Sequence, residues 1–291
     1  YWSITSIFSK DDKQQFTAKL SVLDNNKLAK MDLKNEKETN LALEKIRNSS
    51  FNITKISTKR VRRNPMPPFT TSTLQQEASN KLGFGASRTM RIAQKLYEGI
   101  NIGSETTGLI TYMRTDGVQL STQAIDELRS EITNLHGKEY IPQLPRIYKS
   151  KAANAQEAHE AIRPTAISRH PESMSSYLDA EQLKLYELIW RRTISSQMQS
   201  AELDETAADI SNENKSIVFR ANGSQVHFPG FFIYRDRDDD KILPHLIENE
   251  NVGLEKTDGE QHFTQPPPRY TDASLIKKME ELGIGRPSTY A

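Results

Sequence analysis

The chain has 291 residues, 35% hydrophobic and 26% charged, with 39 lysines and arginines against 38 aspartates and glutamates. This length allows two or three domains of a globular protein, and the net charge of +1 argues against a uniformly basic nucleic-acid binder. No apolar run approaches the roughly 20 residues that span a membrane, and the lack of cysteine excludes disulfides and thiolate zinc sites in these residues.

The first 60 residues alternate apolar and polar side chains, which predicts strands and a hairpin. We expect a turn at 24–26, a helix at about 38–48 and a strand at 51–58. A basic run follows, formed by Lys59, Arg60, Arg62 and Arg63. Its two interpretations, a contact to the DNA backbone and a solvated strand end, are about equally supported. Three prolines within residues 65–68 then mark a boundary.

From residue 69 the hydrophobic period becomes helical. Helices are predicted at 71–82 and 87–97, joined by Gly-Phe-Gly, and a strand at 109–113 follows. Ser121 is expected to cap a third helix, and residues 180–199 form another amphipathic one. A helix–turn–helix followed by a strand resembles a winged-helix module.

Strand patterns return after about residue 199, at 206–210, 216–221 and 228–234. Three prolines at 266–268 form a second boundary, and a short helix at 274–282 is predicted to end at Gly283. An acidic run, made of Asp236, Asp238, Asp239 and Asp240, has the look of a Mg²⁺ motif because hard cations take carboxylate ligands.

Residues 108–116 carry the most informative chemistry. An apolar run ends at Tyr112, and Arg114 follows two residues later, so in a strand both side chains point to one face. Tyrosine hydroxyls ordinarily ionise near pH 10, yet they suit a reaction whose product is a reversible phosphodiester. A guanidinium holds a phosphate through two hydrogen bonds. On spacing alone, a buried strand ending in a surface loop is the commoner interpretation.

This segment resembles the active-site segment of type IA DNA topoisomerases, and four other segments agree with that family in order. They are Thr-Ser-Thr-Leu-Gln-Gln-Glu-Ala at 71–78, Leu-Gly-Phe-Gly at 82–85, Ala-His-Glu-Ala-Ile-Arg-Pro-Thr at 158–165 and Gly-Ile-Gly-Arg-Pro-Ser-Thr-Tyr at 283–290. The sequences at 112–116 and 159–164 point to the bacterial topoisomerase I branch. Because both ends break off inside apparent elements, we expect a central fragment without the family's N-terminal Toprim domain and C-terminal region.

The resemblance implies that Tyr112 cleaves one DNA strand through a 5′-phosphotyrosine intermediate. Strand passage and resealing then relax negative supercoils without ATP, while Arg114 steadies the scissile phosphate. The residues expected to contact or organise DNA are His159, Asp116, Arg163, Arg286, Ser288 and Thr289. On composition alone, His159 is a structural or solvated residue, and residues 285–289 begin an ordinary capped helix.

The resemblance also implies an α+β multidomain fold, part of the type IA toroid. Residues 1–67 and 200–265 would form a discontinuous β-rich arch or hinge domain. Residues 68–199 would form an inserted, winged-helix-like helical domain carrying the nucleophile. Residues 266–291 would begin a further helical DNA-binding domain.

The expected cofactor is Mg²⁺, bound by the Toprim domain and by no residue of this chain. The acidic run is therefore interpreted as a surface loop, and the chain alone is expected to be inactive. The expected partner is DNA, in single-stranded segments of negatively supercoiled duplex. We expect a monomeric cytoplasmic enzyme acting at the nucleoid, with no membrane association.

Two other functions fit parts of the sequence. A non-enzymatic helix–turn–helix DNA-binding protein would need a basic recognition helix, and residues 87–97 carry only Arg88, Arg91 and Lys95. A tyrosine recombinase would need more active-site Arg and His residues and would form a 3′-phosphate linkage. The polarity of a covalent adduct separates these possibilities.

Overall fold

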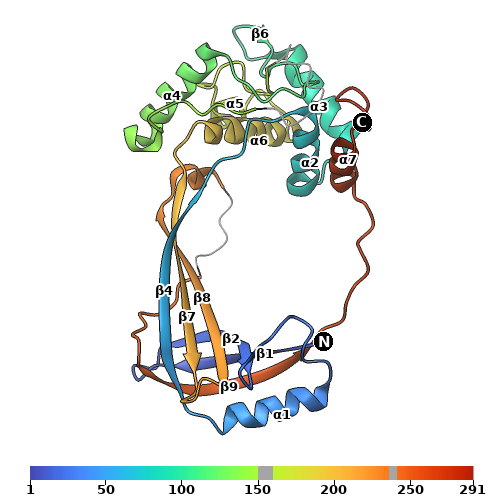
Figure 1. The fold of residues 1–291 in the computed structure, drawn as a ribbon. Coiled ribbons are helices and arrows are strands. Elements are labelled where there is room, and N and C mark those ends of the chain that lie inside the picture. The colour runs from blue at the N-terminus through green and yellow to red at the C-terminus, as the bar shows by residue number, and fades with distance from the viewer. Residues whose placement is uncertain (150–159, 236–240, 291) are drawn as a thin grey trace. The chain divides into compact units, whose positions relative to one another are not determined.

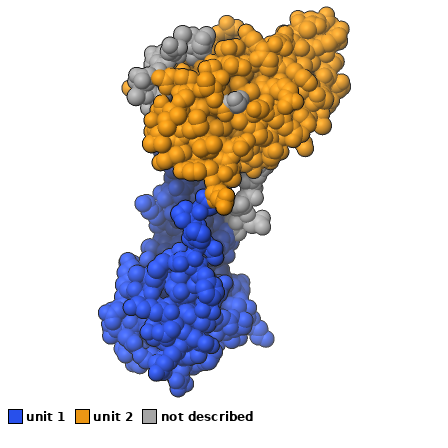
Figure 2. All heavy atoms as spheres, turned by 90° about the vertical axis from the view of Figure 1, so that its right-hand side faces the viewer, with its two compact units in different colours: residues 1–63, 202–228, 237–268 blue, residues 64–201, 229–236, 269–291 orange. Residues whose placement is uncertain are grey.

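The computed structural model describes residues 1–149, 160–235 and 241–290, which form two compact units. Unit 1 comprises residues 1–63, 202–228 and 237–268, and unit 2 comprises residues 64–201, 229–236 and 269–291 (Figure 2). A large sheet in one unit and a helical body in the other confirm the predicted α+β class. Within the described residues, no helix has both the length and the apolar character that crossing a membrane requires.

Unit 1 is built on a sheet that closes on itself (Figure 1). The strand order is β1-β9-β4-β7-β8-β2-β3, and β1 also pairs with β2. The strands are β1 Trp2–Ser9, β2 Gln15–Leu23, β3 Asn26–Lys27, β4 Phe51–Arg63, β7 Ala201–Ser211, β8 Ile217–Phe228 and β9 Asn251–Gln261. Closure pairs the edges that an open sheet would leave exposed.

The inside of this sheet is packed with aromatic rings. Alternate residues of β1 and β2 are buried, as the period-2 pattern predicted. Phe8, Phe51 and Phe219 are each at most 3% exposed and contact one another edge to face, with ring centroids 5.2–5.6 Å apart. Edge-to-face pairs add about 0.5–1.5 kcal/mol beyond the area they bury, so this triad is the centre of the unit.

The helix and the hairpin expected in this region are both present. Helix α1, Glu36–Arg47, begins after Asn35, whose side chain accepts a hydrogen bond from the Glu38 amide. Asp24 and Asn25 have φ of +50° and +64° between β2 and β3. Asp and Asn tolerate this left-handed backbone, and a hairpin turn of this kind requires it.

The three arginines of the basic run in β4 are paired with carboxylates on the neighbouring strand β7. Arg60 pairs with Asp204, Arg62 with Glu202 and Arg63 with Glu205, at 2.7–3.0 Å. The hydrogen bond from Arg60 holds the pKa of the Asp204 carboxyl below its usual value. These cross-strand ion pairs favour the structural interpretation of the run over a contact to DNA.

Unit 2 is mainly helical. Its helices are α2 Thr71–Leu82, α3 Ala86–Glu98, α4 Thr122–His136, α5 Pro171–Met174, α6 Ala180–Ser196 and α7 Asp272–Glu281, with short 3₁₀ helices at Lys138–Tyr140 and Gly230–Tyr234. A small hairpin pairs β5, Ile100–Asn101, with β6, Thr106–Thr107. Ser121 caps α4 as predicted, and Gly283, with φ of +69°, follows the end of α7.

The core of unit 2 surrounds α6. Leu185, Tyr186 and Ile189 of this helix are fully buried and join one apolar cluster with α2 and α3. Residues of the predicted active-site segment, among them Leu109 and Met113, belong to the same cluster. Helix α7 packs on α2 and buries only Ala273 and Ile276.

In the second half of the sheet, one predicted strand is wrong and one observed strand was not predicted. Residues 228–234 do not continue β8, because Pro229 lacks an amide donor and Gly230 turns the chain with φ of +48°. A Cβ at Gly230 would lie 2.5 Å from the carbonyl oxygens of Gln199 and Ser200, so only glycine fits there. Strand β9 was not anticipated, since its polar and glycine-containing sequence has a weak alternation.

The aromatic triad gives the first test of the fold. We expect Phe219→Ala to lower the free energy of unfolding of unit 1 by about 3–5 kcal/mol, the usual cost of removing a buried phenyl ring. Trp2 lies in unit 1 and the only other tryptophan, Trp190, in unit 2, so Trp2 fluorescence in a Trp190→Phe background follows unit 1 alone.

The control is Phe263→Ala in the same unit, because this ring is 72% exposed. Its urea transition should move by less than about 0.5 kcal/mol. Equal effects of the two substitutions would contradict the proposed centre of packing.

Candidate active site

The segment around Tyr112 is irregular and is tied to two other parts of unit 2. The predicted strand at 109–113 is wrong, because its ladder contains a single bridge, between Ile110 and Pro164. Proline has no amide to extend a ladder. On either side of this bridge, the Thr111 amide donates to the Arg163 carbonyl at 2.9 Å, and the Thr165 amide donates to the Leu109 carbonyl at 3.0 Å.

Thr71, the first residue of α2, holds the segment just beyond Tyr112. Its hydroxyl donates to the Met113 carbonyl at 2.7 Å and accepts from the Thr115 amide at 2.8 Å. The Thr71 amide in turn donates to the Thr115 carbonyl at 2.9 Å. Thr71 is fully buried and Thr115 is 2% exposed, so these bonds are shielded from water.

This anchoring leaves Tyr112 and Arg114 at the surface. Met113 and Thr115 point inward, whereas Tyr112 is 39% exposed and Arg114 is exposed. Within the described part of the chain, no hydrogen bond or ion pair engages the Arg114 guanidinium. By contrast, Arg60, Arg163 and Arg192 are each paired with a carboxylate. The cation beside the tyrosine is therefore available to an anion.

Tyr97, near the end of α3, lies against the ring of Tyr112. The ring centroids are 5.4 Å apart at an interplanar angle of 66°, and Tyr97 is 40% exposed. The two chain segments approach closely here: a Cβ at Gly108 would lie 2.5 Å from the Tyr97 carbonyl oxygen. Glycine at 108 is thus required by this close approach.

The Arg163 side chain is largely buried and forms contacts that stabilise the local backbone. Its Nε donates to Glu160 at 2.7 Å and its Nη1 to the Pro164 carbonyl at 3.0 Å, and only 16% of its side chain is exposed. Burial works to raise the pKa of Glu160, but the hydrogen bond and charge of Arg163, with a smaller contribution from Ser121, bring it below its ordinary value. The ion pair stabilises the segment whose backbone holds Thr111.

Residues 286–290 belong to the same unit as the segment around Tyr112. Arg286, Ser288 and Thr289 lie in a turn, with the Arg286 amide donating to the Thr289 hydroxyl at 2.9 Å, and not at the start of a helix within the described residues. Burial and the carboxylates of Glu280 and Asp116 raise the pKa of the Tyr290 hydroxyl, while the charge of Arg286 opposes them. The charge of Asp116 therefore acts on Tyr290.

His159 and the acidic run formed by Asp236, Asp238, Asp239 and Asp240 lie outside the described residues. In the described part of the chain, no group of three or more His, Asp or Glu side chains is arranged to hold a metal ion.

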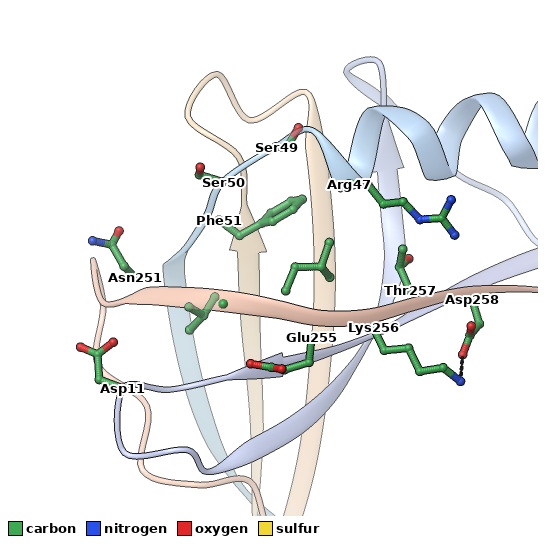
Figure 3. Close-up of a pocket in the computed structure, with 13 residues that line it drawn as sticks. Asp11, Arg47, Ser49, Ser50, Phe51, Asn251, Glu255, Lys256, Thr257 and Asp258 are labelled. Atoms are coloured by element: carbon green, nitrogen blue, oxygen red, sulfur yellow. Dashed lines mark ion pairs between the residues drawn. The ribbon is translucent and has the colours of Figure 1, made fainter.

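Unit 1 has an open hollow between α1, β4 and β9 (Figure 3). Its lining mixes Arg47 and Lys256 with Asp11, Glu255 and Asp258, and Lys256 pairs with Asp258 at 2.6 Å. It contains none of the predicted site residues. The mixed charges do not select one ligand, so this hollow is not a candidate site.

The sequence analysis did not predict the tertiary contacts of three residues in this region. Thr71 lies within the motif at 71–78, but nothing in a single sequence shows that it pairs with Thr115, 44 residues later. Tyr97 looked like an ordinary helix residue, and Tyr290 like part of a helix start. Their roles depend on tertiary contacts that have no local signature.

Comparison with known proteins identifies relatives of the whole chain. A family model described as DNA topoisomerase matches residues 1–291. The DNA topoisomerase 1 of Rickettsia bellii (strain RML369-C) is 52% identical over 298 residues, and that of Xylella fastidiosa (strain Temecula1 / ATCC 700964) is 47% identical over 305 residues. Each alignment covers all of this chain and 37% of the relative, so the chain spans well under half the length of these proteins.

A solved structure agrees with this result. Full-length topoisomerase I from Thermotoga maritima superposes with a TM-score of 0.81 at 36% sequence identity, covering 100% of this chain and 45% of that one.

The anchor formed by Thr71 can be tested directly. Thr71→Val keeps the shape of the side chain but leaves the buried Thr115 amide and Met113 carbonyl without this partner, at a cost of about 1–3 kcal/mol. We expect faster hydrogen exchange in the peptide that contains residues 111–117, whereas Thr71→Ser, which keeps the hydroxyl, should exchange like the wild type. Unchanged exchange in Thr71→Val would show that this hydroxyl does not hold the segment.

Proposed function

The chain belongs to the DNA topoisomerase family, and from this premise we propose that its protein is a type IA DNA topoisomerase that relaxes negative supercoils without ATP. Tyr112 is the nucleophile. The observation that carries the proposal is an exposed tyrosine, followed two residues later by an exposed arginine that no described residue engages, on a segment anchored on both sides. Because the chain covers 37% of its relatives, the activity proposed is that of the intact protein.

The reaction exchanges one phosphodiester for another. The Tyr112 oxygen attacks the phosphorus of one strand and loses its proton, the bond from phosphorus to the 3′ oxygen breaks, and that oxygen takes up a proton to become a 3′ hydroxyl. The tyrosine is then joined to the 5′ phosphate. Attack by the 3′ hydroxyl reverses these steps after strand passage, and because bond energy is conserved no nucleotide cofactor is needed.

Arg114 is proposed to hold the scissile phosphate during both steps. A guanidinium donates to two phosphate oxygens and stabilises the charge that develops on them. Arg163 has a different role: its Nε donates to Glu160 and its Nη1 to the Pro164 carbonyl, so it supports the backbone that holds Thr111 and adds positive charge near bound DNA.

The remaining predicted site residues are proposed to contact or orient DNA. Asp116 would orient His159, whose cationic ring would face a phosphate. The turn containing Arg286, Ser288 and Thr289 supplies one guanidinium and two hydroxyls, the donor types that phosphates accept.

The wider context is proposed from the family. The cofactor is Mg²⁺, held by carboxylates outside these residues, and the substrate is single-stranded DNA within negatively supercoiled duplex. The protein would act as a cytoplasmic monomer at the nucleoid, away from membranes. Residues 1–67 and 200–265 would serve as an arch and hinge, residues 68–199 as the tyrosine domain and residues 266–291 as the start of a further DNA-binding domain.

The non-enzymatic helix–turn–helix alternative is not favoured. Helix α3 would be its recognition helix, but Arg88 on this helix is paired with Glu181 and stacks on the ring of Phe84. Only Arg91 and Lys95 remain as exposed cations there. This is a small charge for reading a major groove.

Tyr112→Phe in the intact protein provides the test of the nucleophile. The variant keeps the ring against Tyr97 and should bind a single-stranded oligonucleotide like the wild type, yet form no covalent adduct because the attacking oxygen is gone. Denaturing gels and electrophoretic mobility shifts measure the two properties. An adduct that survives in Tyr112→Phe would move the nucleophile elsewhere.

Arg114→Lys separates two-oxygen positioning from simple charge. If the planar fork is needed, Arg114→Lys should retain most DNA binding but slow single-turnover cleavage on the order of 10²-fold, the usual consequence of misplacing a reacting phosphate by about 1 Å. If charge suffices, Arg114→Lys should cleave nearly normally and Arg114→Ala should fail. Normal cleavage by both variants would remove Arg114 from the site.

A further inference from the structure

The side chain of Tyr97 is an aromatic surface immediately beside the proposed nucleophile. The planes of the Tyr97 and Tyr112 rings lie at 66° to each other, so the edge of one ring contacts a face of the other. With 40% of Tyr97 exposed, ring surface remains accessible to another molecule. Single exposed aromatic side chains are common on protein surfaces, so the position of Tyr97 against Tyr112, and not its exposure, sets it apart.

The position of Tyr97 is fixed by its neighbours. The preceding residue, Leu96, is fully buried, and its carbonyl accepts from the Leu109 amide at 2.7 Å. The Tyr97 backbone abuts Gly108, and the helix ends at Gly99, with φ of +138°. Tyr97 therefore belongs to the same cross-linked framework as Tyr112, so the two rings keep their relative position.

If Tyr112 attacks DNA, the group of the DNA that best suits the neighbouring Tyr97 ring is a nucleobase. A phosphate is better served by Arg114, which carries the charge that Tyr97 lacks. A nucleobase offers a flat π face, and bases of single-stranded DNA stack on aromatic side chains without strong sequence preference. The base nearest the phosphate under attack is the one that the geometry brings to this ring.

We propose that Tyr97 is a positioning residue that stacks on the nucleobase adjacent to the scissile phosphate and so aligns that phosphate with Tyr112. The inference rests on the proposed function, because it requires that Tyr112 attack DNA. The stacked base fixes the nucleotide on one side, Arg114 holds the phosphate, and the contact between the two tyrosine rings sets the direction of attack.

The test combines a protein change with a DNA change in the intact protein. Single-turnover cleavage of a single-stranded oligonucleotide is measured for wild type, Tyr97→Leu and Tyr97→Phe, each with intact DNA and with an abasic nucleotide on either side of the mapped cleavage point. We expect Tyr97→Leu to cleave intact DNA about 5–150-fold more slowly, the range that stacking of one base supplies. Tyr97→Phe, which keeps the ring, should cleave within about 3-fold of wild type.

The abasic substrates distinguish stacking from a structural role. At one of the two positions, loss of the base should slow the wild type by a similar factor but leave Tyr97→Leu unaffected, since the partner ring is already absent. Independent, multiplying effects at both positions would overturn the proposal. So would normal cleavage by Tyr97→Leu.

Tyr177→Leu is the matched control, because this tyrosine of unit 2 is 43% exposed and lies outside the site. It should cleave at the wild-type rate, and circular dichroism and thermal melting should report a folded protein for every variant. If the wild type itself forms no adduct, the proposed function fails. If the wild type forms an adduct but the effects of Tyr97→Leu and of the missing base are independent, only the inference about Tyr97 fails.

Discussion

The candidate site depends on hydrogen bonds that join residues 108–117 to residues 160–165 and to the start of α2, where residues 69–71 lie. None of the three is a regular strand, so no repeated ladder holds Tyr112 in place. The Thr71 hydroxyl and the carbonyl of Arg163 do this from opposite sides of the tyrosine. Sites on loops are less rigid than sites on helices or strands, and these buried cross-links supply the missing rigidity.

The same framework decides which side chains are available for chemistry. Burial of Met113 and Thr115 turns their neighbours outward, and Glu160 engages Arg163 while leaving Arg114 to solvent within the described residues. Charge is thus paired where it supports the backbone and left available where a phosphate is proposed to bind. An exposed but anchored aromatic ring, Tyr97, lies against Tyr112, so the proposed nucleophile, a cation and a proposed stacking face belong to one anchored segment and its neighbour.

Sequence reasoning succeeded where the signals were local. The limits of α2, the Ser121 cap and the glycine after α7 follow from hydrophobic period and capping chemistry. It failed at 109–113 and 228–234, where β-branched or aromatic runs suggested strands but prolines at 164 and 229 interrupt pairing. The partners of Thr71, Tyr97 and Tyr290 could not be predicted, because residues far apart in sequence create them. Tyr112 and Arg114 were identified by family resemblance, since their spacing alone is common.

The central claim is that Tyr112 becomes joined to the 5′ phosphate of a cleaved strand. The most direct measurement is to trap the adduct of the intact protein with oligonucleotides labelled at one end or the other, and to identify the modified peptide by mass spectrometry. The account predicts that the 3′-end label stays with the peptide containing Tyr112, while the 5′-end label leaves on a fragment with a 3′ hydroxyl. Retention of the 5′-end label, or modification of another residue, would contradict it.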